Sequence, residues 1–257
     1  MKAGLQQEWY LFLLALQFMT RLPIPSNVPF SDDHLFRAAR YYPLVGLVVG
    51  AIGGCILLLS AAVLPALAAV VLSIAATVYV TGAFHEDGLA DTADGLGGGL
   101  TKERVLDIMR DSQVGSYGAV ALVLTFGLKA ALLAGVTPGD AFALLLSGHA
   151  LSRFSAVQVM RTTEYARPEG AKFVAPSIDR STYWCALAFS AAIVVVVALW
   201  LGWTITLAGI VLGVASTFFL RARLLRRLEG YTGDTLGAVQ QVSEIAFYLG
   251  AIAAMAG

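Results

Sequence analysis

The sequence predicts an all-α protein, a polytopic integral membrane bundle of about seven spanning helices with a short N-terminal helix at the membrane interface. Hydrophobic residues make up 58% of the 257 residues and charged residues 13%, whereas soluble proteins average about 25% charged residues. The mean hydropathy is +0.76. Apolar runs of about 20 residues, the length that crosses a bilayer as a helix, recur along the chain.

The N-terminal helix is expected in the apolar block from Trp9 to Met19, which is too short to span a bilayer. No small-residue cleavage site follows this block, and Arg21, Pro23 and Pro25 come instead. We therefore expect an uncleaved helix that lies at the interface or dips into it.

Seven apolar spans follow, and short turns join the first six in pairs. Pro65 separates the first pair, a turn at 137–140 joins the second, and Gly202 breaks the third. The expected spans are residues 43–64, 66–84, 116–136, 139–160, 183–201, 203–220 and 236–255. No repeat period is visible, so residues 1–257 are expected to form one membrane-embedded catalytic domain.

The positions of lysine and arginine predict the orientation, because cytoplasmic connections are enriched in both. Four segments hold fifteen of the seventeen basic residues, and the three opposite connections hold none. These cytoplasmic segments are residues 1–42, 85–115, 161–182 and 221–235.

Four ionisable residues fall inside the spans, where a charge is costly and usually faces a partner or a cavity. Arg153 and Glu244 lie about two helical turns from the cytoplasmic ends of their spans, so each could extend to the interface. Lys129 is deeper, and either an ion pair between helices or a binding role would explain it. His149 is the fourth of these residues.

An acidic segment from Thr81 to Asp111 interrupts the apolar pattern. Asp87, Asp91 and Asp94 stand at i, i+4 and i+7, a spacing that places them on one face of a helix. Side by side, three carboxylates repel one another unless a cation lies between them, and oxygen ligands suit a hard ion such as Mg²⁺. This face is therefore predicted to bind magnesium, although a solvated acidic face at the membrane surface is the simpler alternative.

Glycines beside these acids favour the metal site over the solvated face. Gly88 and Gly95 permit the close approach of a ligand or another helix, and the glycines at 97–99 are expected to end the helix. A second helix should follow, with charges at helical spacing: Arg104, Asp107 and Asp111.

A glycine-rich turn at residues 230–237 opens the last span. Thr232 or Asp234 can cap this helix, and exposed amides at a helix start attract phosphate. An ordinary capped loop is the alternative, as is a plain anchoring role for the arginines that precede it: Arg221, Arg223, Arg226 and Arg227.

Clustered carboxylates, glycine turns and arginines at one membrane face fit metal-assisted phosphoryl transfer, in which a substrate hydroxyl attacks directly. Neither a Walker loop nor a serine-histidine-acid arrangement is present in the sequence. A formal net charge of zero offers no basic footprint, so nucleic acid is not an expected partner.

Three motifs resemble the adenosylcobinamide-GDP ribazoletransferase family, also called cobalamin synthase. They are FHEDGLADTADGL at 84–96, MRDSQVGSYG at 109–118 and GYTGDTLGA at 230–238. FMTRLPIP from Phe18 and YYPLVGLVVG from Tyr41 resemble it more weakly, so the resemblance spans nearly the whole chain.

The resemblance implies a multi-pass, magnesium-dependent enzyme of the cytoplasmic (inner) membrane, with its active site facing the cytoplasm. Such an enzyme joins adenosylcobinamide-GDP to α-ribazole or α-ribazole 5'-phosphate and releases GMP. The ribazole hydroxyl would attack the phosphorus attached to cobinamide. Membrane lipid is a further expected partner, and a homo-oligomer is possible.

Roles carried over from the resemblance make Asp87, Asp91 and Asp94 magnesium ligands, with Asp111 as a fourth. Expected catalytic residues are Asp94, His85 and Arg110, where His85 either orients the substrate or acts as general base. Expected substrate-binding residues are Arg104, Gly233, Asp234 and Glu244.

Two other functions are considered beside this one. A phospholipid synthase of the CDP-alcohol phosphotransferase type also uses clustered aspartates, but its usual motif has an arginine soon after the Asp-Gly pair, and none follows Asp87 and Gly88. A cation or proton transporter, with Lys129, Arg153 and Glu244 along a pathway, would distribute its acids across the membrane, whereas here they cluster at one side.

Overall fold

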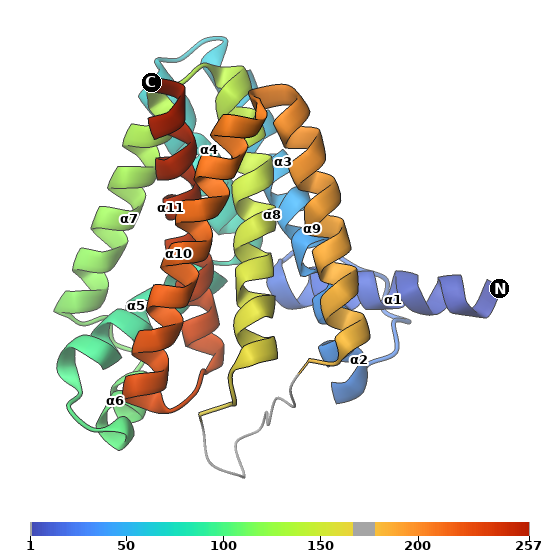
Figure 1. Ribbon diagram of the computed structural model, residues 1–257, viewed down its shortest axis with the longest axis vertical. Coiled ribbons are helices and arrows are strands. Elements are labelled where there is room, and N and C mark those ends of the chain that lie inside the picture. Colours follow the sequence, from blue (N-terminus) through green and yellow to red (C-terminus); the bar gives the residue numbers. More distant parts are fainter. Residues whose placement is uncertain (1, 167–177, 257) are drawn as a thin grey trace.

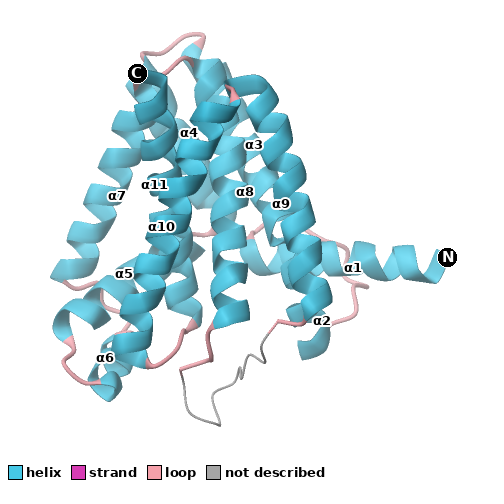
Figure 2. Ribbon diagram, viewed as in Figure 1, coloured by secondary structure: helices cyan, strands magenta, loops and turns pink. Residues whose placement is uncertain are grey.

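The computed structural model describes residues 2–166 and 178–256, and this part of the chain is almost entirely helical (Figures 1 and 2). The residues described form no β-strand, only an isolated parallel bridge between Tyr165 and Tyr231. The predicted all-α class is confirmed. Of the predicted cytoplasmic segment 161–182, residues 167–177 lie outside the described residues.

Long helices occupy each of the seven predicted spans. They are α3 (Tyr42–Ala61), α4 (Ala66–Thr81), α7 (Ser116–Ala134), α8 (Pro138–Thr162), α9 (Arg180–Leu201), α10 (Trp203–Leu228) and α11 (Gly233–Ala256). Within the described ranges, five helical stretches are long and apolar enough to cross a membrane: Asp32–Ala61, which contains α3, and α7, α9, α10 and α11. There are six such stretches if α4 and the following helix, Phe84–Gly98, are counted as one bent span.

Helix α8 is absent from that set and lies in the middle of the bundle. It packs against α3, α9 and α11, and Figure 1 shows it between α10 and α9. Because these neighbours shield it from lipid, α8 can carry polar side chains that an isolated span could not, and Ser147, His149, Ser152 and Arg153 are all buried.

The connections between the long helices follow from local chemistry. Thr137 caps α8 by accepting the Asp140 N–H at 3.1 Å, with Pro138 as the first helical residue. Asp179 caps α9 by accepting the Thr182 N–H at 2.7 Å. Gly202 adopts a φ of +94° between α9 and α10, a conformation that only glycine adopts readily. The three predicted helix pairs are therefore confirmed.

The N-terminal helix α1 (Lys2–Met19) begins earlier than predicted and runs across the direction of the bundle (Figure 1), as expected of an interfacial helix. A short helix α2 (Asp32–Ala38) and a 3₁₀ turn (Ala39–Tyr41) follow it. Buried Arg40 donates to Glu8 of α1 at 3.0 Å and to Thr182 of α9 at 3.3 Å. One guanidinium thus ties α1 to the bundle.

The acidic segment forms helix α5 (Phe84–Gly98), which is bent by 90° from α4. Gly82 and Ala83 both have left-handed backbones, with φ of +67° and +59°, and they make this corner. The Arg21 N–H donates to the Val80 carbonyl at 2.7 Å beside it. As predicted, the glycines after residue 96 end α5, and a second helix, α6 (Lys102–Ile108), follows.

Helices α5 and α6 lie at the lower end of the bundle in Figure 1, beside the α10–α11 connection. The opposite end carries the α3–α4, α7–α8 and α9–α10 connections and the C-terminal end of α11. In the part of the chain that the structure describes, the segments rich in lysine and arginine are therefore gathered at one end, as the sequence predicts.

Candidate functional site

A cavity of about 250 Å³ lies at the end of the bundle where α5 crosses it. Its walls come from α1, α2, the start of α3, α5, α8 and α11, and most of the lining is apolar or aromatic, including Phe18, Phe84 and Met160. A few polar residues converge on it, which is the usual composition of a small-molecule site. They include His85, Asp87, Arg153, Tyr231 and Asp234.

Two of the sequence motifs meet at this cavity because α5 and α11 approach very closely. A Cβ on Gly88 would lie 2.5 Å from the Asp234 carbonyl oxygen, and one on Gly237 would lie 3.0 Å from the His85 carbonyl oxygen. The predicted close approach at Gly88 is thus to another helix. It brings Asp87 and Asp234, 147 residues apart in the sequence, to one cavity.

The acidic stripe of α5 divides between two environments. Asp87 is exposed and lines the cavity, and Asp91 is half-buried. Asp94 is buried, and its two oxygens accept the backbone N–H groups of Gly115 at 2.7 Å and Gly118 at 2.9 Å. Asp94 therefore fixes the start of α7 against α5 and is not part of the cavity lining.

The four carboxylates predicted to bind magnesium do not form a closed cage. Asp111 is exposed and accepts the Gln113 N–H at 3.0 Å, away from the cavity lining. Among the described residues, no three His, Cys, Asp or Glu side chains are grouped to hold a metal ion. However, Mg²⁺ commonly uses one or two carboxylates and completes its coordination with water and substrate phosphates. Asp87 and Asp234 at the cavity, with Asp91 one turn from Asp87, suit that kind of binding.

The two arginines predicted to contact phosphate lie on or just after α6, and neither lines the cavity. Arg104 is exposed, and its backbone N–H donates to the capping Thr101 hydroxyl at 3.3 Å. Arg110 is also exposed and forms a weak pair with Asp107 at 3.8 Å. Thus the structure does not bring these two arginines to the cavity.

The glycine-rich turn contributes to the cavity as predicted. Gly233 and Asp234 both line it, and Thr232 caps α11 by accepting the Thr235 N–H at 3.3 Å. The Thr235 hydroxyl in turn accepts the Thr232 N–H at 2.8 Å, so the turn is held by a reciprocal pair of bonds. His85 is buried against the Phe84 ring and also lines the cavity.

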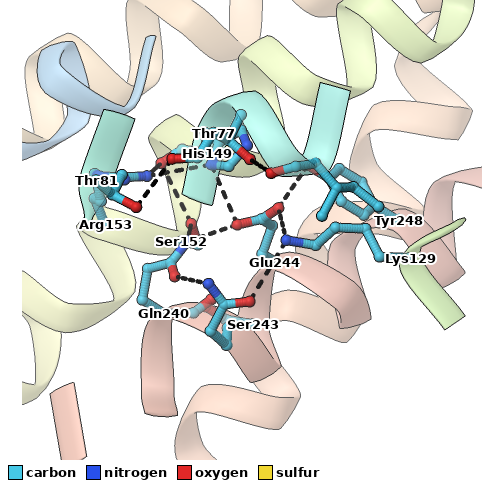
Figure 3. Close-up of polar contacts among 12 residues, drawn as sticks. Thr77, Thr81, Lys129, His149, Ser152, Arg153, Gln240, Ser243, Glu244 and Tyr248 are labelled. Carbon is cyan, nitrogen blue, oxygen red and sulfur yellow. Dashed lines mark hydrogen bonds and ion pairs between the residues drawn. The ribbon is translucent and has the colours of Figure 1, made fainter. Parts of the chain in front are cut away.

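Glu244 does not line the cavity. It lies at the centre of a buried polar network (Figure 3). The Lys129 ammonium lies 2.8 Å from its carboxylate and His149 Nδ1 lies 3.3 Å away. Tyr248 donates a hydrogen bond to Glu244 at 2.9 Å, and Gln240 donates another to Glu244 at 2.6 Å. Of the two explanations left open for Lys129, the structure shows the ion pair, which joins α7 to α11.

The idea that Arg153 and Glu244 extend to the interface is wrong, because their exposed fractions are 1% and 0%. Both are surrounded by other helices, so neither needs to reach the membrane surface to avoid lipid. The expected contact of Glu244 with substrate also loses its basis, since the carboxylate is enclosed by protein partners.

Arg153 and Tyr231 line the cavity but were not among the site residues expected from the resemblance. Arg153 stands on α8, and its charge inside an apolar span was the one available signal. Tyr231 has a buried hydroxyl without a hydrogen-bond partner among the described residues. Burial, reinforced by Tyr165, raises the pKa of Tyr231 to about 12, so the hydroxyl keeps its proton at neutral pH and can donate to a ligand.

A family model and individual relatives both place this chain beside the same group of proteins. Residues 11–252 match the model of the cobalamin-5-phosphate synthase family. An adenosylcobinamide-GDP ribazoletransferase of Leptothrix cholodnii is 46% identical, over 98% of both chains. Proteins of the same name from Shewanella amazonensis and Ralstonia nicotianae are 43% and 44% identical, each over 95% of both chains. No solved structure matches.

Proposed function

Because this chain belongs to the cobalamin-5-phosphate synthase family, we propose that it joins adenosylcobinamide-GDP to α-ribazole or α-ribazole 5'-phosphate and releases GMP. The chain is an enzyme of the transferase class, and this reaction would complete cobalamin. The observation that carries the proposal is the meeting of the motifs at 84–96 and 230–238 around one polar-lined cavity.

In this reaction the ribazole hydroxyl oxygen forms a bond to the phosphorus that is attached to cobinamide. The bond from that phosphorus to the bridging oxygen breaks, and GMP leaves with the electron pair. The His85 imidazole, placed on the cavity wall, accepts the hydroxyl proton. The protein otherwise positions the two substrates and neutralises phosphate charge.

Magnesium is proposed as the cofactor, with Asp87 and Asp234, the two carboxylates that line the cavity, as the residues that would hold it. When bound, Mg²⁺ neutralises charge on the diphosphate and favours departure of GMP. Asp94 and Asp111 are left out of this set because one holds the start of α7 and the other lies away from the cavity lining.

The cavity volume limits how the substrate can lie. A space of about 250 Å³ admits the diphosphate and the reacting hydroxyl but is far too small for a corrinoid ring with its side chains. The corrinoid therefore stays outside the cavity during the reaction. We place this end of the bundle at the cytoplasmic face of the inner membrane, because the basic residues of the connections gather there.

The test is turnover by the purified protein in lipid nanodiscs, with adenosylcobinamide-GDP and α-ribazole as substrates and mass spectrometry of both products. We expect GMP release that stops with chelator and returns with added Mg²⁺. Asp87→Asn should lower kcat by about 100-fold or more, the scale seen when one charge-stabilising group is removed. Release of CMP from CDP-diacylglycerol and an alcohol, without GMP release, would instead support a phospholipid synthase.

A further inference from the structure

Arg153 is a buried cation at a cavity wall. It stands on α8 with an exposed fraction of 1%, yet it is one of the residues that line the cavity beside α5. A guanidinium removed from water to this extent needs hydrogen-bond acceptors and a compensating negative charge.

The protein supplies only part of what this guanidinium needs. Nη1 donates to the His149 carbonyl of the same helix at 2.9 Å. Nε has no hydrogen-bond partner, and no carboxylate of the described residues lies within ion-pair distance of Arg153. The Arg153 side chain thus keeps unused donors and an unpaired charge.

The obvious counter-ion nearby is already engaged. Glu244 pairs with Lys129 at 2.8 Å and contacts His149 at 3.3 Å, and Tyr248 and Gln240 fill its remaining acceptor positions (Figure 3). Lys129 therefore lies beside this carboxylate, and the second buried carboxylate, Glu86, accepts from Gln241 and forms no ion pair with Arg153. Arg153 is thus left without a direct ion pair among the described residues. His149 lies between the two groups, because its ring Nδ1 is 3.3 Å from Glu244 and 3.4 Å from Arg153 Nη1, and its carbonyl accepts from Arg153.

We propose that Arg153 is a substrate-binding residue that holds the diphosphate of the nucleotide-activated substrate inside the cavity. A guanidinium presents planar N–H donors that suit phosphate oxygens, and an anion in the cavity would supply the missing acceptors and charge. This inference rests on the proposed function for the identity of the ligand. The binding of an anion is inferred from Arg153 and the cavity alone.

Inorganic pyrophosphate with Mg²⁺ is the probe that separates the two proposals, because its binding requires no corrinoid chemistry. Calorimetry on the full chain in nanodiscs should show binding to the wild type and a loss of affinity of about 10- to 100-fold in Arg153→Gln. Arg161→Gln is the matched control, since Arg161 is on the same helix but does not line the cavity, and it should bind as the wild type does.

Steady-state kinetics give the second readout. Arg153→Gln should raise KM for adenosylcobinamide-GDP by about 10- to 100-fold and leave KM for α-ribazole within about twofold. Arg153→Lys, which keeps the charge but loses the planar donors, should recover part of this loss. A purely structural role would lower the melting temperature and affect both substrates alike.

These measurements distinguish a failure of the Arg153 site from a failure of the proposed function. Unchanged pyrophosphate affinity in Arg153→Gln, beside normal GMP release by the wild type, would overturn this inference and leave the proposed function standing. Arg153-dependent pyrophosphate binding without any GMP release by the wild type would support this inference and overturn the proposed function. Should Arg153→Gln fail to fold, Arg153→Lys decides, and an affinity equal to that of the wild type would refute the site.

Discussion

At the scale of single residues, Asp87 and Asp94 show how one stripe of acids can serve two purposes. Both stand on the same face of α5, but Asp87 opens onto the cavity while Asp94 is buried against the start of α7. The environment of each carboxylate decides its role, because a carboxylate whose oxygens accept buried amides is held by the fold.

The first prediction concerns the stability supplied by Asp94. In Asp94→Asn the side-chain amide can accept only one of the two N–H bonds, so one buried backbone amide loses its partner. We expect a loss of about 1 to 3 kcal/mol in the free energy of unfolding, measured by denaturant titration in mixed micelles. Exposed Asp87→Asn is the control and should unfold as the wild type does. Equal stability of the two variants would contradict this account.

The sequence could not have separated these two acids. Helical spacing puts them on one face, but the amides that bind Asp94 come from positions 21 and 24 residues further along the chain. Nothing local in the acidic motif signals that contact. Likewise, Arg104 and Arg110 have the right chemistry for phosphate, and only the path of the chain after Gly99 moves them away from the cavity.

At the scale of helices, the site depends on α5 lying directly on the start of α11. Gly88 and Gly237 make that contact possible, since neither has a side chain to separate the two backbones. The sequence predicted a close neighbour at Gly88 without deciding between a ligand and a helix, and the structure decides for the helix.

The second prediction is that Gly88→Ala reduces activity by separating these helices. The added methyl group would lie 2.5 Å from the Asp234 carbonyl oxygen, so α5 or α11 must shift and move Asp87 relative to Asp234. We expect kcat/KM to fall by at least about tenfold, because small misplacements at a reacting centre are costly. Gly98→Ala on the same helix, where only the flexible end of Ile108 is near at 3.2 Å, should retain activity. Comparable losses in both variants would show that the α5–α11 contact is not the cause.

The third prediction concerns the ion pair between α7 and α11. Lys129→Met leaves the Glu244 carboxylate buried without its cation, and we expect it to destabilise the protein by about 3 to 5 kcal/mol. Adding Glu244→Gln to Lys129→Met should restore a large part of that loss, because the uncompensated charge is then gone. Unfolding titrations of the two single variants and the double variant measure this coupling, and strictly additive losses would argue against a direct pair.

At the scale of the whole molecule, the sequence predicted where helices begin and end better than how they are arranged. Hydropathy and capping residues are local, so they located all seven long helices. The 90° corner at Gly82 and the placement of α1 and α2 on the cavity wall depend on contacts between distant segments. Helix α8 illustrates the same limit, because its polar residues are tolerable only when its neighbours are known.

The fourth prediction tests the orientation of the bundle in the cell. Single cysteines can be introduced by Val63→Cys in the α3–α4 connection and Ser112→Cys between α6 and α7, after the two native cysteines are replaced. An impermeant maleimide should label the Val63→Cys protein in intact cells and the Ser112→Cys protein only after permeabilisation. The opposite labelling pattern would reverse the orientation and place the cavity outside the cytoplasm.

The cavity draws its walls from nearly the full length of the polypeptide, from Phe18 on α1 to Gly237 on α11. During synthesis, the ribosome must therefore deliver the last helix before this compartment can close. Until then, the nascent chain carries Lys129 in the bilayer without Glu244, its ion-pair partner. Release from the insertion machinery is expected to wait for α11, so the cavity is the final part of the protein to mature.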